Sequence, residues 1–86
     1  MPRISEFFGI VIYMYFSEHS PPHFHALYGG EEASFSIDTL DILEGSLPRR
    51  VVALVLEWAA LHRAELRNNW DATREGKPPI QITPLE

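Results

Sequence analysis

The stretch PHFHALYGGEEASFSID, residues 22–38, contains two runs of alternating apolar and polar residues on either side of Gly29-Gly30. A glycine pair between two such runs predicts an antiparallel hairpin. A two-residue loop places Phe24 opposite Phe35, Ala26 opposite Ala33, His25 opposite Ser34 and His23 opposite Ser36. A four-residue loop shifts the partners by two and leaves the faces unchanged, whereas an odd loop reverses them. With an even loop, His23 and His25 lie on the polar face of the sheet.

The preceding segment, Phe8 to Phe16, is also strand-like. Its even positions are all apolar, and it is rich in β-branched and aromatic residues. Because side chains alternate between the two faces of a strand, we expect Tyr13 and Tyr15 to share the histidine face. The segment 41–43 is expected to add a short further strand.

A single long helix is predicted from about residue 47 to about residue 75. Ser46 is expected to be its N-cap, Pro48 falls in its first turn, and Gly76 is expected to end it. At 100° per residue, one apolar stripe covers the sheet. The stripe consists of Val51, Val55, Trp58, Ala59 and Leu66. After the helix, Ile80, Ile82 and Leu85 predict either a short strand or an extended tail on the core.

These elements predict an α+β fold of two layers. A three- or four-stranded antiparallel sheet would be followed by one long helix packed on its apolar face. With 86 residues, 45% of them hydrophobic, the chain has room for a single domain over residues 1–86. A polar sheet face that holds two tyrosines is rarely left bare, so we expect a homodimer or a partner contact there.

Composition excludes several classes of protein. The chain has no cysteine, so neither a disulfide framework nor a thiolate zinc site is available. Its longest apolar stretch is about ten residues, too short for a membrane span, and a cytoplasmic location is therefore expected. The net charge is −5, with seven acids and one base (−6) in residues 1–47 and five acids and six bases (+1) in residues 48–86. This balance argues against binding nucleic acid by bulk electrostatics.

Three of the four histidines lie within seven positions, at His19, His23 and His25. Imidazole is the commonest protein metal ligand and the side chain that titrates nearest neutrality. His23 and His25 leave one face of a strand with Cα atoms about 6.6 Å apart, a span that can chelate one ion. His19 would supply a third ligand from the turn. The cluster therefore predicts a site for a divalent metal such as zinc or nickel, and the competing interpretation is a set of surface histidines bonded to the facing serines.

Proton transfer is a further alternative for the same residues. One neutral and one protonated imidazole, from His23 and His25, would flank a phosphodiester as in a metal-independent ribonuclease. Tyr13 or Tyr15 would then stack on a base of the RNA. The acidic first half of the chain argues against this interpretation, because it repels RNA.

Four arginines line one flank of the predicted helix, between 120° and 160° on the helical wheel. They are Arg49, Arg63, Arg67 and Arg74. This arginine stripe is either a solvated face with i,i+4 pairs or a surface for an acidic partner or a phosphate backbone. His62 falls near the centre of the apolar stripe, where a hydrogen-bonded, half-buried side chain is expected.

The stretch Glu18-His-Ser-Pro-Pro-His-Phe-His-Ala26, followed by Tyr28-Gly29, resembles domain of unknown function 4160, a family of small bacterial proteins. The resemblance extends along the chain to Leu47-Pro48-Arg49, Trp58, His62, Leu66, Asn69-Trp70 and Ile82-Thr83-Pro84-Leu85. The family has no established activity to transfer.

The resemblance also implies a partner. Members are often encoded beside a second small protein, of domain of unknown function 2442, in an arrangement similar to a toxin–antitoxin operon. We therefore expect a partner-binding component of a two-gene toxin–antitoxin-type system with a histidine site for a divalent metal. The alternative is a histidine-dependent ribonuclease, a toxin-like enzyme that cleaves RNA.

Overall fold

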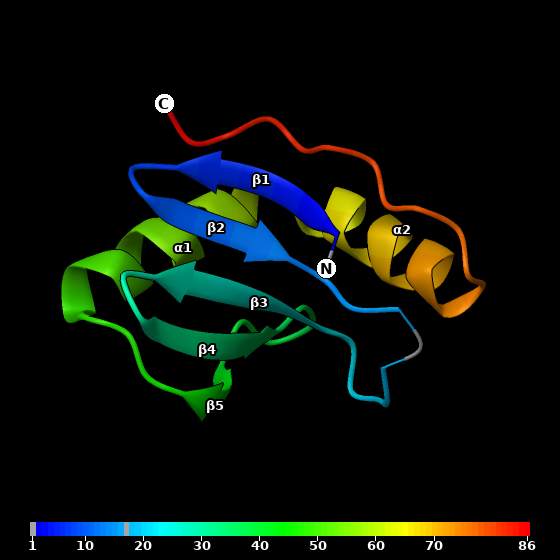
Figure 1. Ribbon diagram of the computed structural model, residues 1–86, viewed down its shortest axis with the longest axis horizontal. Helices are drawn as coiled ribbons and strands as arrows, with labels where there is room; N and C mark the ends of the chain where they lie inside the picture. The colour runs from blue at the N-terminus through cyan, green and yellow to red at the C-terminus, as the bar shows by residue number, and fades with distance from the viewer. Residues whose placement is uncertain (1, 17) are drawn as a thin grey trace.

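The computed structural model describes residues 2–16 and 18–86. Its elements, in chain order, are β1 (Arg3–Phe7), β2 (Ile10–Tyr13), β3 (His23–Tyr28), β4 (Glu31–Ser36), β5 (Ile42–Gly45), α1 (Arg49–Leu61) and α2 (Arg63–Arg74). The five strands form one antiparallel sheet in the order β1-β2-β3-β4-β5 (Figure 1). The α+β class is confirmed, and the prediction of three or four strands and one helix is corrected to five strands and two helices.

The predicted β3–β4 hairpin has the register of a two-residue loop. Phe24 pairs with Phe35 and His25 pairs with Ser34. Both phenylalanines are fully buried, and their rings stack at a centroid distance of 5.3 Å. Since side chains alternate along a strand, this pairing fixes the histidines on the opposite face of the sheet.

The prediction of one continuous strand over residues 8–16 is wrong. Phe8 and Gly9 have φ of 50° and 79° and form a two-residue turn between β1 and β2. Positive φ at both central residues matches the right-handed twist of paired strands, and glycine adopts it without steric cost. The alternation could not predict this turn, because the apolar residues on either side of Gly9 continue the strand-like pattern through it.

The long helix is also corrected. His62 leaves the helical region, with φ −127° and ψ 27°, and separates α1 from α2. The N-cap of α1 is Pro48 rather than Ser46, and it makes no side-chain capping bond. Apolar spacing continues across His62, so periodicity alone cannot detect a break of one residue. The predicted end is confirmed, since Gly76 follows α2 with φ 77°.

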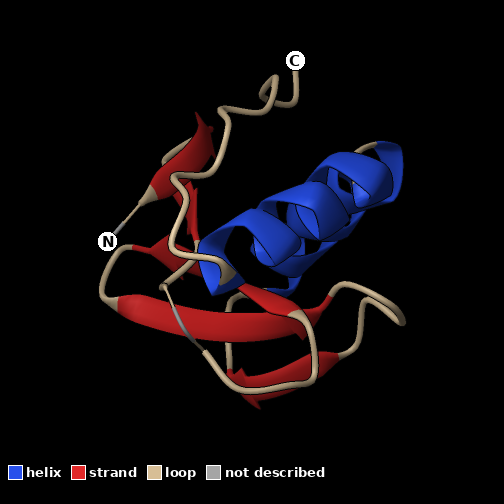
Figure 2. Cartoon of the chain, turned by 90° about the vertical axis from the view of Figure 1, so that its right-hand side faces the viewer, coloured by secondary structure: helices blue, strands red, loops and turns tan. Residues whose placement is uncertain are grey.

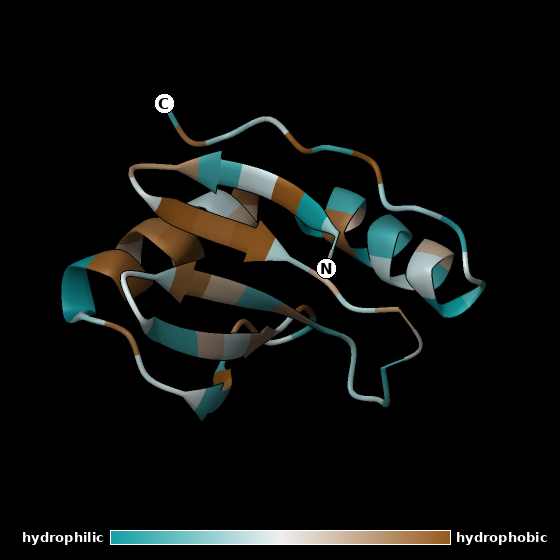
Figure 3. Ribbon diagram, viewed as in Figure 1, coloured by the Kyte–Doolittle hydropathy of each residue, from teal (hydrophilic) through white to brown (hydrophobic). Residues whose placement is uncertain are grey.

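The helices cover one face of the sheet, as Figure 2 shows, and the core lies between the two layers. The predicted helix stripe is buried throughout, with Trp58 fully inaccessible. Figure 3 shows the most hydrophobic stretches on β2 and on α1. Neither helix in the described part of the chain is both long and apolar enough to cross a membrane.

The C-terminal segment is an extended tail, one of the two forms expected. The Ile82 N–H donates to the Ile4 carbonyl at 2.8 Å, which places the tail beside β1. The Asn69 amide donates to and accepts from the backbone of Ile80, both at 2.8 Å. Trp58 Nε1 donates to the Thr83 carbonyl. These bonds join the tail to both layers.

Candidate metal centre

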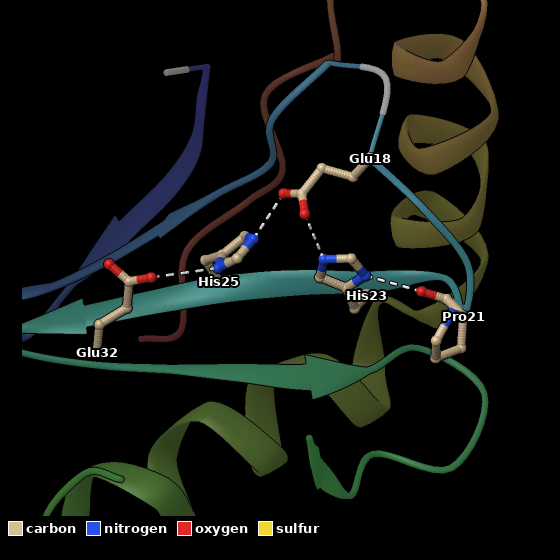
Figure 4. A network of polar contacts seen from close by, with 5 residues as sticks. All are labelled: Glu18, Pro21, His23, His25 and Glu32. Carbon is tan, nitrogen blue, oxygen red and sulfur yellow. Dashed lines mark hydrogen bonds and ion pairs between the residues drawn. The ribbon is translucent and has the colours of Figure 1, made fainter. Parts of the chain in front are cut away.

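Glu18, His23 and His25 bring their polar atoms together on the sheet face opposite the buried Phe24 and Phe35. Glu18 Oε2 lies 2.9 Å from His23 Nε2, and Glu18 Oε1 lies 2.7 Å from His25 Nε2. One ligand atom from each of the three lies within 4.8 Å of the others. Figure 4 shows the carboxylate above the strand, between the two rings. Two imidazoles and a carboxylate form a donor set that could hold a metal ion.

Strand geometry positions the two rings. His23 and His25 are two residues apart on β3, so they project from the same face. Their rings lie 5.1 Å apart at an angle of 73°. Glu18 comes from the segment between β2 and β3, which returns over this face. The site therefore combines a rigid strand with a loop carboxylate.

The second nitrogen of each ring also lies near an oxygen. His23 Nδ1 is 2.7 Å from the Pro21 carbonyl, and it donates this bond because a carbonyl can only accept. His25 Nδ1 is 3.4 Å from Glu32 Oε2. This nitrogen is buried and has no hydrogen bond of good geometry within the described residues. Both Nε2 atoms thus face Glu18, and both Nδ1 atoms face outer oxygens.

Aromatic packing restrains the rings further. Tyr13 stacks on His25 at 5.1 Å and 11°, and Tyr15 meets His25 edge-on at 5.0 Å. The expectation that both tyrosines share the histidine face is therefore confirmed. Trp70, from α2, packs against His23 at 5.1 Å. Such contacts reduce the rotamers open to each imidazole.

Electrostatics favours an ionised Glu18. Burial alone would raise the pKa of this carboxyl, but the hydrogen bonds and positive charge of His25 and His23 outweigh burial, and the pKa falls below its usual value. Burial raises the pKa of Tyr13 well above its ordinary range, and its contact with Glu32 adds to this effect. A phenol held in its protonated form is a poor proton acceptor.

A cavity of about 430 Å³ adjoins the three residues. The cavity is lined by residues of the segment 18–25, by residues 32–34 of β4, and by Leu43 to Gly45 of β5. Glu18, Glu32 and Glu44 line it, and the described lining residues include no lysine or arginine. The cavity therefore carries negative charge next to the candidate ligands.

The structure distributes the predicted site residues differently from the sequence prediction. His19 is exposed and lines the cavity, but the group of three ligands contains Glu18 instead. Tyr13 is only 1% exposed, which leaves almost none of its ring for stacking on a base. His62 is half-buried and bonded to Glu65 at 2.6 Å, as expected for a structural histidine.

The arginine stripe is divided by the helix break. Arg49 lies on α1, and the other three arginines lie on α2. Arg67 pairs with Asp38 at 2.9 Å. Arg74 donates to Ser20 Oγ at 3.1 Å and lies over Trp70. Two of the four arginines thus contact the chain itself, and the role of the stripe in partner binding stays a prediction.

Sequence reasoning missed Glu18 as a candidate ligand, although it lies beside His19 in the histidine-rich segment. It also gave no sign that Trp70, which belongs to the buried core, contacts His23 as well. The first residue could have been found by counting every carboxylate near the cluster as a ligand. The second depends on where α2 crosses the sheet, which spacing does not give.

The family model described as Domain of unknown function (DUF4160) matches residues 9–71. The match spans well over half of the chain, and the chain belongs to this family. No curated protein matches the chain. No solved structure matches it either.

Proposed function

We propose that this member of the DUF4160 family binds a divalent transition-metal ion between Glu18, His23 and His25, and that it acts as the partner-binding component of a two-gene toxin–antitoxin-type system. The donor set of two imidazoles and one carboxylate supports the first part. The family expectation of a small partner of the domain of unknown function 2442 type supports the second.

One observation carries the metal proposal. Because His23 Nδ1 donates to the Pro21 carbonyl, a neutral His23 has a lone pair at Nε2. That lone pair faces Glu18 Oε2 at 2.9 Å. Two acceptors repel each other at this distance unless a proton or a metal cation lies between them. A ring that donates its other N–H to a backbone carbonyl is the usual arrangement of a metal-binding histidine.

The outer contact of His25 supports the same assignment. A carboxylate near the non-ligating nitrogen orients a metal-binding imidazole and increases its basicity. Glu32 stands in that position at 3.4 Å from Nδ1. Three protein ligands leave one position of a tetrahedral zinc site open, as in zinc sites that bind a substrate or water. The adjoining cavity gives that position access to a small ligand or a side chain.

Metal entry requires a small movement. The two nitrogen–oxygen distances, 2.7 and 2.9 Å, are those of hydrogen bonds. Tetrahedral ligands about 2.1 Å from zinc lie about 3.4 Å apart, so Glu18 would withdraw by roughly 0.5 Å. Glu18 is on a connecting segment between β2 and β3, where such a shift costs less than on a strand.

The ribonuclease alternative is less well supported by the same geometry. Three carboxylates line the cavity, and they would repel a phosphodiester. Tyr13 is buried, so of the two proposed stacking residues only Tyr15, which is 41% exposed, is left for a base. If expression alone arrests growth and degrades cellular RNA, and His23→Ala or His25→Ala abolishes both effects, the ribonuclease replaces the metal proposal.

The metal proposal is tested by calorimetric titration of metal-free, untagged protein with zinc and with nickel. We expect one ion per chain and an affinity at least about 100-fold lower in His25→Ala and in Glu18→Gln. His19→Ala is the matched control, and its affinity should stay within about twofold of the native value, because His19 is outside the ligand group. Circular dichroism checks that each variant is folded.

Two results would contradict the metal proposal. The first is a folded native protein that binds neither ion, in which case Glu18 and the histidines form an ion-paired cluster only. The second is a loss of affinity in His19→Ala with affinity retained in Glu18→Gln, which would assign the third ligand to His19.

A further inference from the structure

The two edges of the sheet differ in what covers them. At the β1 edge, the C-terminal tail donates the Ile82 N–H to the Ile4 carbonyl. At the other edge, β5 is the last strand of the described sheet, and all four of its residues are exposed. Figure 1 shows the tail beyond β1 and no segment beyond β5. An uncovered edge strand presents backbone N–H and C=O groups to another chain.

The β5 edge combines apolar and acidic side chains. Ile42 and Leu43 are 43% and 42% exposed. The register shifts between the pairs that Glu44 and Ile42 make with β4, which places Leu43 at a bulge. Residues 31–45 hold five acids and no lysine or arginine. Of these acids, Asp38 is paired with Arg67.

A row of side chains runs across the sheet from the candidate ligands to this edge. Tyr13 pairs with His25, His25 with Ser34, and Ser34 with Glu44. Directly opposed residues in an antiparallel sheet share a face, so all four belong to the histidine face. Glu44 ends the row, and it lines the same cavity as His25. A strand added beside β5 would place one residue next in this row.

We propose that β5 binds an extended, basic segment of a partner protein as a sixth strand, with a lysine or arginine opposite Glu44. The inference deepens the partner-binding role proposed above and rests on it. Main-chain bonds to β5 would supply affinity, and alternate side chains would supply specificity, as in other cases of strand addition. An opposite-charge pair across strands is favourable, and a like-charge pair is unfavourable.

Charge also decides against a second copy of this chain as the occupant. Pairing two β5 strands would bring together two edges that each carry Asp41 and Glu44 and no base. A short, bulged, acidic edge disfavours self-association in general. A basic strand removes the repulsion and neutralises the acidic cavity beside the proposed metal.

The test uses the full chain loaded with zinc and a fluorescein-labelled peptide of eight residues in which valine and lysine alternate. A second peptide has glutamate in place of lysine, and a third has every backbone nitrogen methylated. Fluorescence anisotropy should show binding of the lysine peptide only. Glu44→Lys should weaken this binding at least about tenfold, and Glu57→Lys, the same change on the exposed side of α1, should leave it within about twofold.

The zinc stoichiometry of each variant is measured in the same samples. Loss of peptide binding in Glu44→Lys with zinc still bound supports the edge assignment independently of the metal proposal. The assignment is overturned if the lysine and methylated peptides bind equally, if Glu44→Lys binds as the native protein does, or if the lysine peptide does not bind at millimolar concentration. A native dimer that Glu44→Lys converts to a monomer would also overturn it, by identifying the occupant as a second copy.

Discussion

At the residue scale, Glu18 contacts both histidines of the candidate site. Its two oxygens each face an imidazole Nε2, so one carboxylate orients both rings. Its side chain is 24% exposed, and those of both histidines are 12% exposed. Contacts between such partly buried groups are screened less by salt than those of surface ion pairs. Replacing Glu18 therefore removes both of the contacts that connect His23 and His25 through one carboxylate.

The lowered pKa of Glu18 predicts a pH dependence of stability in the metal-free protein. A carboxyl whose pKa is lower in the folded than in the unfolded chain stabilises the fold above the unfolded value of 4.5. This contribution is lost as the pH falls through the lower, folded value. We therefore expect the unfolding free energy of the native protein, relative to Glu18→Gln, to decrease as the pH falls below about 5.5 and on past 4.5.

Urea denaturation at a series of pH values measures this difference. Glu57→Gln, which removes an exposed carboxylate on α1, is the control for loss of one negative charge. A difference between the native protein and Glu18→Gln that stays constant or grows toward low pH would show that the pKa of Glu18 is not lowered by folding.

At the element scale, β5 depends on a close backbone approach. Gly45 has φ 78°, and a Cβ placed there would lie within van der Waals overlap of the Glu32 carbonyl oxygen and 3.0 Å from the Ala33 Cα. Neither neighbour can move easily, because both belong to the backbone of β4. The glycine thus lets β5 pair with β4 at the edge of the cavity.

Gly45→Ala should therefore destabilise the protein by about 1–3 kcal/mol, through the positive φ and the backbone clash. Gly30→Ala is the matched control, since its Cβ would meet nothing within 4 Å, and we expect a change of less than about 0.5 kcal/mol. Denaturant unfolding measures both variants. Equal effects of the two substitutions would contradict the close approach at Gly45.

The elements also show where periodicity succeeds and fails. The β3–β4 hairpin followed from Gly29-Gly30, and the structure shows the register of the two-residue loop among those considered. The turn at Phe8-Gly9 and the break at His62 were missed because the apolar pattern continues through both. A pattern of burial reports which face a residue occupies, and it does not report whether the backbone changes direction between two buried residues.

At the scale of the whole molecule, one helical layer and a tail enclose the core, and the histidine face is itself largely buried, with Tyr13, Ser34 and Ser36 each 8% exposed or less. The C-terminal tail joins β1 through Ile82 and α2 through Asn69. Trp70 and Arg74 of α2 reach the segment that carries the site, through His23 and Ser20. Folding of the whole chain is therefore coupled to the geometry of the candidate ligands.

Binding of zinc to the proposed site should raise the thermal unfolding midpoint, because the ligands come together only in the folded chain. A ligand at about 100 times its dissociation constant stabilises the folded state by about 2.7 kcal/mol, if it does not bind the unfolded chain. For a domain of this size the thermal midpoint would rise by roughly 10–20 °C. We expect this rise in the native protein and in His19→Ala, measured by differential scanning calorimetry. His25→Ala should show almost none, and an equal rise in His25→Ala would place zinc elsewhere.

The sequence by itself determined the α+β class, the central hairpin, the buried stripe of the helices and the location of the histidine cluster, and the structure selected the hairpin register among the loop lengths considered. These follow from local spacing, because alternation in a strand and periodicity in a helix fix the face of each residue. Only the tertiary structure decided that Glu18 rather than His19 meets His23 and His25, and that Trp70 packs on the site. It also decided that the β1 edge is covered and the β5 edge is open. These contacts depend on how connecting segments and α2 return to the sheet, and sequence spacing does not encode that path.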